Sequence, residues 1–249
     1  MRAKPPQAGS VPAEFRACPE REPEGRKSAC SDVANLHPWS AQDFSDTPSP
    51  GPLVPSRAVH LCLDMQNLLG PDGPWQAKWA ERVLPGVVSL VEHAPARTIF
   101  TRFMPPAEPQ DAPGAWRDFY RKWEGITLKQ IEPEMLELMA PLNLFAPPAR
   151  IIDKQRYSAF STPETDEALR ALGAEAVIVS GAESDMCVLA TVLAAVDLGY
   201  PVIVAEDAVC SSADPTHEAV QELYHSRFSR QVRTMQTAAI KQLWRPVDD

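Results

Sequence analysis

The stretch from Val177 to Ser212 constrains the fold more than any other part of the chain. Val177–Ser180 is a β-branched run typical of a strand, and turn-forming residues follow it. Cys187–Leu198 has small and apolar residues at helical spacing, and Pro201–Ala205 has the pattern of a second buried strand. Cys187 is therefore expected in the first turn of a helix, just past the carboxyl end of a strand, where helix N–H groups favour a thiolate and a neighbouring oxyanion. A small, buried core residue is the alternative interpretation of this cysteine.

Strands and helices alternate from Arg57 onward. The expected strands are Ala58–Leu63, Thr98–Phe103, Ile151–Lys154, Val177–Ser180, Pro201–Ala205 and Gln231–Thr234. The expected helices are Trp75–Glu92, Pro163–Leu172, Cys187–Leu198, Pro215–Ser226 and Thr237–Trp244. This alternation requires a parallel sheet with helices on both faces. We therefore predict an α/β fold, a three-layer α/β/α Rossmann-like architecture around a six-stranded, mostly parallel sheet. No G-x-G-x-x-G motif follows the first strand, which argues against a dinucleotide-binding oxidoreductase.

Two segments differ from this alternating pattern. Residues 1–55 hold ten of the 26 prolines and show little periodicity, so we predict a proline-rich, disordered N-terminal tail there and a folded domain over residues 56–249. The tail either binds a partner or is functionally silent. Residues 104–144 form a long connection with an aromatic-rich stretch, which either covers a site, forms a subunit contact or packs onto the core.

Composition narrows the class of protein. The formal net charge is -9 and the sequence pI is about 5.1, so nucleic acid and anionic membranes are not expected as partners. The five cysteines are widely spaced and include no C-x-x-C pair, which fits neither a disulfide framework nor a zinc module. No hydrophobic signal core or membrane-length apolar run is present, and we predict a cytoplasmic protein.

Asp64, Lys154 and Cys187 each end a predicted strand or open the helix that follows one. The carboxyl ends of parallel strands lie along one edge of the sheet, so these three residues are expected to converge. A lysine ammonium favours a thiolate, and a carboxylate can take the thiol proton and later protonate a leaving amine. A turn-capping carboxylate and a solvated lysine paired with Asp153 are the alternative interpretations of the first two.

Six further residues are candidates for substrate contacts: Gln66, Asn67, Arg102, Trp116, Tyr157 and Phe160. Five of them follow or end a predicted strand at the same edge, whereas Trp116 belongs to the aromatic-rich connection and, with Tyr120 and Trp123, is a candidate to close the pocket. Gln66 and Asn67 follow the expected base, although turn chemistry explains them equally well. Arg102 ends the second strand and has the geometry to bind a carboxylate through two hydrogen bonds.

Three motifs resemble the isochorismatase-like cysteine hydrolases, a superfamily that includes nicotinamidases, N-carbamoylsarcosine amidohydrolase and biuret hydrolase. They are LDMQN at 63–67, IIDKQRYSAF at 151–160, and the long stretch VSGAESDMCVLATVLAAVDLGYPVIVAEDA at 179–208. The resemblance covers residues 57–244 and implies an isochorismatase-like hydrolase domain. It also implies a catalytic triad with Asp64 as general base, Lys154 as charge partner and Cys187 as nucleophile. A cis peptide bond at Ala182–Glu183, with the N–H groups of Glu183 and Cys187 as oxyanion hole, follows from the same resemblance.

The resemblance also bears on cofactors and assembly. Nicotinamidases hold a metal through an Asp and His cluster after the second strand, and residues 103–116 contain no histidine. We therefore predict no catalytic metal and no other cofactor, and we do not expect nicotinamide as substrate. Members of the superfamily are commonly oligomeric, so a homodimer or homotetramer is expected.

Together these observations predict a metal-independent cysteine hydrolase, an amidohydrolase that cleaves a C–N bond other than a peptide bond. Its substrate would be a small amide, carbamoyl or ureido compound, and its acyl-enzyme would form on Cys187. The alternative is a protein of the same fold that binds partners without catalysis, because a fold does not fix a function.

Overall fold

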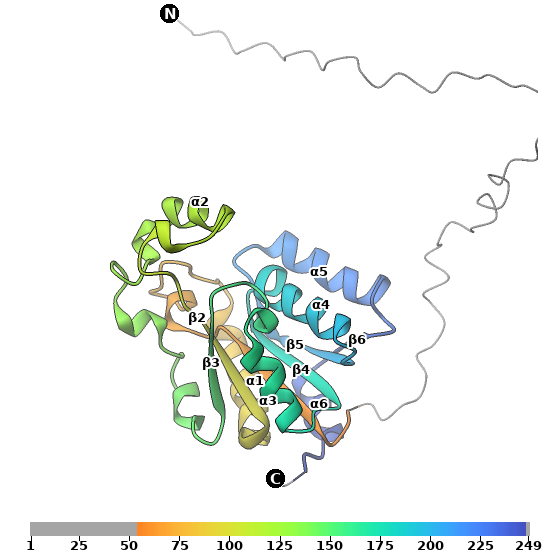
Figure 1. Cartoon of the computed structure of the whole chain (residues 1–249). Coiled ribbons are helices and arrows are strands. Elements are labelled where there is room, and N and C mark those ends of the chain that lie inside the picture. The colour runs from red at the N-terminus through yellow and green to blue at the C-terminus, as the bar shows by residue number, and fades with distance from the viewer. Residues whose placement is uncertain (1–53, 248–249) are drawn as a thin grey trace, which may run out of the picture. The chain divides into compact units, whose positions relative to one another are not determined.

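The computed structural model describes residues 54–247, and a six-stranded sheet forms its centre (Figure 1). The strand order is β3-β2-β1-β4-β5-β6, and every neighbouring pair is parallel. The strands are β1 (Ala58–Leu63), β2 (Thr98–Phe103), β3 (Arg150–Lys154), β4 (Ala176–Ala182), β5 (Val202–Cys210) and β6 (Val232–Met235). The predicted α/β class and six-stranded parallel sheet are confirmed.

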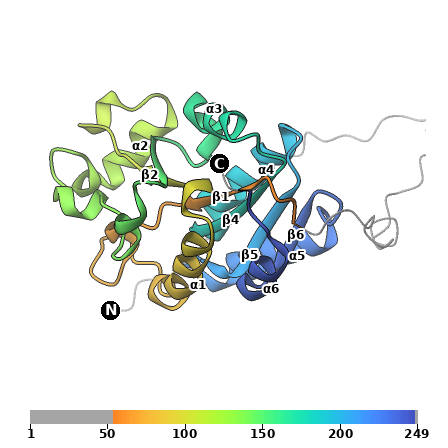
Figure 2. The same ribbon diagram turned by 90° about the horizontal axis from the view of Figure 1, so that it is seen from below.

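Helices cover both faces of the sheet, because successive strand residues point to opposite sides and both sides are apolar. The helices are α1 (Ala80–His93), α2 (Ala115–Lys122), α3 (Pro163–Ala171), α4 (Leu189–Asp197), α5 (Asp214–Ser226) and α6 (Thr237–Leu243). One core cluster joins α1 and α6 to one face of the sheet, and the other joins α3, α4 and α5 to the opposite face. Figure 2 shows α1 and α6 on one side of the strands and α3 on the other.

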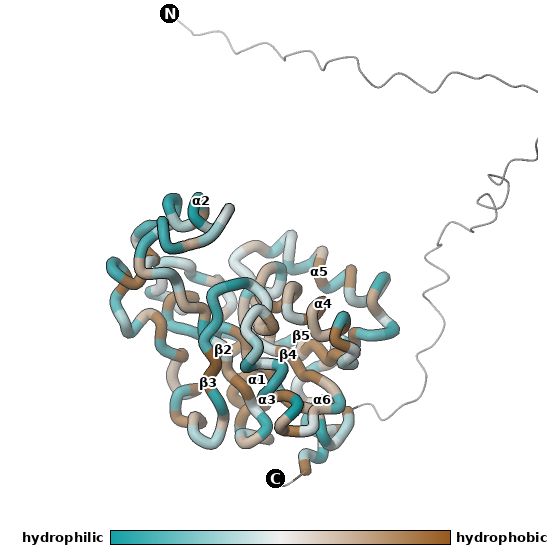
Figure 3. The backbone as a smooth tube through the Cα atoms, in the orientation of Figure 1, coloured by the Kyte–Doolittle hydropathy of each residue, from teal (hydrophilic) through white to brown (hydrophobic). Residues whose placement is uncertain are grey.

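The connection from β2 to β3 carries α2 and a series of short 3-10 turns. Figure 3 shows hydrophobic positions concentrated in the strands, whereas hydrophilic positions predominate along α2. The aromatic residues of this connection nevertheless pack inward, and Tyr120 is fully buried in a small cluster with Phe103 and Ala112. No helix between residues 54 and 247 has the length and apolar character needed to cross a bilayer.

Several predicted element boundaries differ from the structure, and three of these differences are large or affect Cys187. Helix α1 begins at Ala80, not at Trp75, and the residues before it form a loop. A five-residue π-helical turn, Ser184–Val188, precedes α4, so Cys187 lies in that turn. Strand β5 continues to Cys210, past the predicted end at Ala205.

The predicted tail, residues 1–55, lies outside the described residues except at its last two positions. Val54 is buried in the core cluster of α1 and α6. The folded part of the chain therefore includes at least residues 54 and 55, and the character of residues 1–53 stays a prediction.

Candidate active site

The three predicted catalytic residues meet at the carboxyl edge of the sheet. Asp64 follows β1, Lys154 ends β3, and Cys187 lies in the turn after β4. The chain proceeds outward from β1 in one direction and from β4 in the other, so β1 and β4 flank the point where the strand order reverses. Ligands of open α/β sheets bind at such a point.

Lys154 connects the other two residues. Its ammonium donates hydrogen bonds to Asp64 Oδ2 at 2.7 Å, to the carbonyl of Arg156 at 2.9 Å and to Cys187 Sγ at 3.5 Å. The ammonium also lies 5.1 Å from the centre of the Phe103 ring. The side chains of Lys154 and Asp64 are almost completely buried, so this ion pair is poorly screened by solvent.

The backbone and a neighbouring strand fix the Asp64 carboxylate. Asp64 has a φ of 52°, in the left-handed region that aspartate tolerates better than most residues. Its N–H donates to the carbonyl of Thr101 on β2 at 3.1 Å, and Thr101 Oγ1 donates to Asp64 Oδ1 at 2.6 Å. Each carboxylate oxygen therefore has its own donor, Thr101 for Oδ1 and Lys154 for Oδ2.

Electrostatics at the site favour a neutral thiol in the resting protein. Burial raises the pKa of Cys187 well above its ordinary value, the Asp64 carboxylate raises it further, and Lys154 opposes both. Burial alone would lower the pKa of Lys154, but Asp64 and Cys187 bring it above the usual value. The resting state is therefore an ammonium paired with a carboxylate beside a protonated thiol, which differs from the thiolate that the helix position and lysine alone predict.

Close packing of β1 against β4 brings the base and the nucleophile together. Gly181 has a φ of 108°, and a Cβ there would lie 2.1 Å from the carbonyl oxygen of Leu63. Only glycine permits this approach one residue before Asp64 on β1. One residue further along the chain, the Ala182–Glu183 peptide bond is cis, as the resemblance implies.

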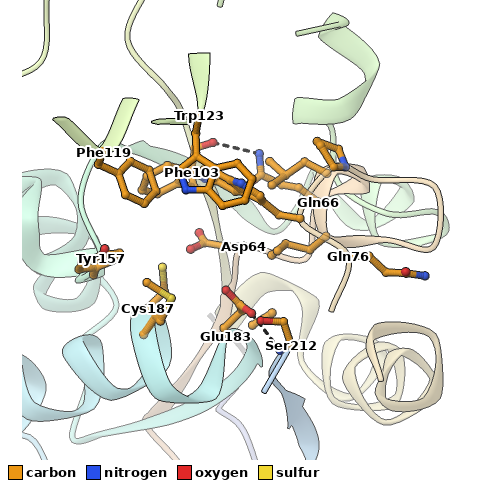
Figure 4. A pocket seen from close by; sticks show the side chains of 16 residues that line it. Asp64, Gln66, Gln76, Phe103, Phe119, Trp123, Tyr157, Glu183, Cys187 and Ser212 are labelled. Carbon is orange, nitrogen blue, oxygen red and sulfur yellow. Dashed lines mark hydrogen bonds between the residues drawn. The ribbon is translucent and has the colours of Figure 1, made fainter. Parts of the chain in front are cut away.

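A cavity of about 510 Å³ opens above these residues (Figure 4). The side chains that line it are Asp64, Gln66, Leu68, Leu69, Pro74, Trp75, Gln76, Phe103, Phe119, Trp123, Tyr157, Glu183, Met186, Cys187 and Ser212, together with Ala182. Figure 4 shows Phe119, Phe103 and Trp123 along one side of the cavity and Glu183 and Ser212 along the other. Asp64 and Cys187 lie between these two sides.

Two of the six predicted substrate contacts line the cavity, Gln66 and Tyr157. The Gln66 amide is already engaged with the backbone: Nε2 donates to the carbonyls of Leu136 and Phe103, and Oε1 accepts from the N–H of Phe103. Its observed contacts therefore hold the cavity wall in place. The Tyr157 ring packs on Trp116, with ring centres 4.7 Å apart, and faces the cavity from the loop after β3.

The structure places the other four outside the cavity lining. Arg102 donates to Asp153, its direct partner across β2 and β3, and to Glu137. Asn67 donates to the carbonyl of Glu134. Trp116 lies behind Tyr157, and Phe160 packs in the core cluster of α3, α4 and α5. Arg102 in particular has its donors directed at two carboxylates of this chain.

Several lining residues were not singled out as site residues from the sequence. Trp75 and Gln76 belong to the loop before α1, which apolar spacing had suggested was helix. Phe119 lies in the aromatic-rich connection and lines the cavity beside Trp123, which was the only one of these two expected to close the pocket. Nothing in the local pattern distinguishes Met186 and Ser212 from ordinary turn residues.

Within residues 54–247, no three His, Cys, Asp or Glu side chains lie together as metal ligands. His217, near the start of α5, shares a hydrogen bond with Ser184 Oγ at 2.8 Å and packs against Trp79. The prediction that no metal takes part stays a prediction.

Comparisons with known proteins agree with this arrangement. The family model described as Isochorismatase domain matches residues 58–236. A protein of Arabidopsis thaliana, named as a probable inactive nicotinamidase, is 27% identical over 166 residues, which are 64% of this chain and 83% of that protein.

Solved structures show the same fold. A cysteine hydrolase from Pseudomonas syringae pv. phaseolicola 1448A superimposes with a TM-score of 0.69 at 23% identity, covering 80% of this chain and 97% of that one. N-carbamoylsarcosine amidase from Thermoplasma acidophilum superimposes with a TM-score of 0.59 at 18% identity, covering 72% and 96%. The chain therefore belongs to the isochorismatase family of hydrolases.

Proposed function

We propose that this protein is a cysteine amidohydrolase that cleaves a C–N bond of a small amide, carbamoyl or ureido compound without a metal. The observation that carries the proposal is the ammonium of Lys154, which bonds both Asp64 Oδ2 and Cys187 Sγ at the base of a cavity. A nucleophile within reach of a base that is itself oriented by a third group is the arrangement needed for covalent catalysis.

In the first half of the reaction, Cys187 Sγ attacks the substrate carbonyl carbon while its proton passes to Asp64. The N–H groups of Glu183 and Cys187 stabilise the resulting oxyanion. The tetrahedral intermediate collapses with cleavage of the C–N bond, and Asp64 gives its proton to the leaving nitrogen. Ammonia or an amine departs, and a thioester remains on Cys187.

In the second half, water attacks the thioester carbonyl and gives a proton to Asp64. The second tetrahedral intermediate expels the sulfur, which takes that proton back from Asp64 as the acid product forms. Lys154 keeps its charge throughout, so the carboxylate is reformed beside a cation at the end of each half. The neutral resting thiol suits this scheme because the sulfur needs to ionise only when substrate is present to accept it.

The size of the cavity and the solved relatives support a small substrate. A volume of about 510 Å³ lies in the range of small-molecule sites. One structural neighbour is named as an amidase for N-carbamoylsarcosine, which supports the C–N class.

A binding protein without catalysis is the second candidate, and one observation favours it: the Arabidopsis relative is named as probably inactive. The retained Asp64, Lys154 and Cys187, with their hydrogen bonds formed, argue for catalysis.

Ammonia release across small amides, ureas, carbamoyl amino acids and nicotinamide tests the proposal, measured beside Cys187→Ala. We expect one substrate class to be hydrolysed and the activity to vanish in the variant with the fold intact. Hydrolysis that survives in Cys187→Ala would overturn the acyl-enzyme. Silence across the panel, in a chain that is folded and has an intact Cys187, would favour the binding protein.

A further inference from the structure

The charges that line the cavity are unbalanced. Two carboxylates, Asp64 and Glu183, are among the lining residues, and no Lys, Arg or His of the described chain is. Lys154 neutralises Asp64 from below the cavity floor. Glu183 has no such partner among residues 54–247.

We propose that Glu183 selects a positively charged substrate, an amide or ureido compound that carries an ammonium or similar cation close to the group that is cleaved. This inference rests on the proposed function, because it names the substrate class of the same cavity. Glu183 acts as a specificity-determining residue through its side chain.

The Glu183 carboxylate is held in place by one hydrogen bond and can accept more. Oε1 accepts a hydrogen bond from the N–H of Ser212 at 2.9 Å, and the described residues provide no partner for Oε2. The negative charge of Glu183 also acts on Tyr157, another residue of the cavity. Burial raises the pKa of the Tyr157 hydroxyl most, Cys187 raises it further, and Glu183 adds a smaller contribution in the same direction. A fixed carboxylate with a free oxygen is a ready partner for a charged N–H donor.

The wall opposite Glu183 suits a cation as well. Trp75, Phe103, Phe119 and Trp123 line it, and Trp75 meets Trp123 edge to face with ring centres 6.0 Å apart. Figure 4 shows Phe119 and Trp123 across the cavity from the Glu183 carboxylate. Aromatic faces attract ammonium groups, most strongly where water is excluded. A cation between the rings and Glu183 would be stabilised from both sides.

Among the described residues that line the cavity, none offers a positive charge to an anionic substrate. The Lys154 ammonium donates to Asp64, to the Arg156 carbonyl and to Cys187, so none of its three protons is free. Arg102 is held by Asp153 and Glu137 outside the cavity. A substrate carboxylate would therefore enter a negatively charged cavity without compensation.

Thiol reagents of different charge test the inference without requiring turnover. We would compare the rates at which 2-(trimethylammonium)ethyl and 2-sulfonatoethyl methanethiosulfonate modify Cys187 in the full chain, read by site-resolved mass spectrometry. Each rate is divided by that of the same reagent with N-acetylcysteinamide. The ratio of cation to anion then does not depend on the pKa of Cys187, because both reagents meet the same thiolate.

Glu183 is half-buried, and we expect the cation to be favoured at least about tenfold, as a partly screened unit charge a few ångströms away implies. Glu183→Gln keeps the shape and the oxygen that accepts from Ser212, and it should reduce the preference about tenfold. Glu167→Gln, the same change on the exposed side of α3, should leave it unchanged. Trp123→Leu should reduce it about threefold through the lost aromatic face.

A native ratio near that of the free thiol, or a ratio that Glu183→Gln does not lower, would overturn the inference. A strong preference that depends on Glu183 would sustain it even if no amide were hydrolysed, since modification requires no turnover. If hydrolysis is found, Glu183→Gln should raise KM for a cationic substrate at least about tenfold and change KM for its neutral isostere little. An equal rise for both would contradict charge selection.

Discussion

At the scale of single residues, Asp64 has two opposing effects on Cys187. Its carboxylate accepts the thiol proton in the proposed reaction, yet its charge also raises the pKa of that thiol. Asp64→Asn should therefore lower hydrolysis by about 10²–10⁴-fold through loss of the base. The same change should move the pH profile of Cys187 alkylation to lower pH, because a charge that disfavours the thiolate is gone.

Iodoacetamide modification of Cys187 across pH 6–10 measures this shift in the native chain and in Asp64→Asn. Asp118→Asn, on the exposed surface of α2, is the matched control and should leave the profile unmoved. A profile in Asp64→Asn that stays in place or moves to higher pH would contradict the assigned electrostatics.

Loss of the Lys154 side chain should lower stability strongly, because the side chain is buried and paired with Asp64. Lys154→Met leaves the buried Asp64 carboxylate without its cation, which should lower the free energy of unfolding by about 3–5 kcal/mol. Adding Asp64→Asn to that variant removes the unpaired charge, so the double variant should be more stable than Lys154→Met alone. Urea denaturation measures the free energy of unfolding of the native chain, of Lys154→Met and of the double variant.

Arg170→Met serves as the control because it breaks an exposed ion pair with Asp166, which solvent screens, so little loss of stability is expected there. Equal losses for the buried and the exposed pair would show that the Asp64–Lys154 pair is solvated.

The sequence predicted the positions of Asp64, Lys154 and Cys187 because each lies at a strand end, a property that does not depend on packing detail. It did not predict the protonation of Cys187, since the burial that raises its pKa is a property of the whole cavity. Arg102 illustrates the same limit. The register that places it opposite Asp153 appears only once β2 and β3 are paired.

At the scale of elements, the contact between β1 and β4 depends on Gly181. Gly181→Ala would place a methyl group 2.1 Å from the Leu63 carbonyl oxygen, and the strands would have to separate beside Asp64. We expect a loss of more than about 3 kcal/mol in unfolding free energy, because both the left-handed φ and the collision contribute. Hydrolysis should fall as well.

Gly199→Ala isolates the backbone contribution. Gly199 also has a positive φ, 89°, but nothing lies within 4 Å of a Cβ placed there. This variant should lose only about 1–2 kcal/mol and keep its activity. If chemical denaturation gave the same loss for both variants, close approach of β1 and β4 would not be the reason for Gly181.

Most elements could be predicted from periodicity, and β1 and β2 have the predicted bounds. The start of α1 could not be predicted from periodicity. Trp75 and Trp79 have helical spacing, but the N–H groups of Trp75 and Ala77 donate back to the carbonyls of Leu68 and Leu69 and hold a loop. The extension of β5 to Cys210 could not be predicted from the sequence either, because its pairing with β4 is interrupted between Val204 and Val209. Both features depend on contacts outside the local pattern.

At the scale of the whole molecule, a buried histidine makes stability depend on pH. His60 lies fully buried in β1, with Nε2 2.7 Å from Ser180 Oγ, and burial lowers its pKa to about 3. The unfolded chain binds a proton at this position below about pH 6.5, whereas the folded chain does not until near pH 3. Stability from this residue is therefore complete above pH 6.5 and is lost as the pH falls.

Between pH 6.5 and 5.0 the native chain should lose about 2 kcal/mol of unfolding free energy through this residue. His60→Gln should remove that part of the pH dependence whatever its effect on absolute stability. His225→Gln, on the exposed end of α5, is the control and should retain it. Parallel pH dependence in the native chain and in His60→Gln, followed by urea denaturation, would contradict a neutral His60.

The fold class could be predicted in full because it follows from the order of elements alone. The expected oligomer, the cytoplasmic location and the disordered tail stay predictions. The cavity itself could not be predicted, since its lining comes from six separate parts of the chain that only the folded sheet brings together.

Glu183 joins two tasks that many enzymes divide between residues. In the proposed reaction its backbone N–H serves the chemistry, while its side chain faces the substrate. Every amino acid except proline supplies the same N–H. Position 183 can therefore vary in side chain while the oxyanion contact is kept, and a lineage could exchange one substrate for another there without first losing its rate enhancement.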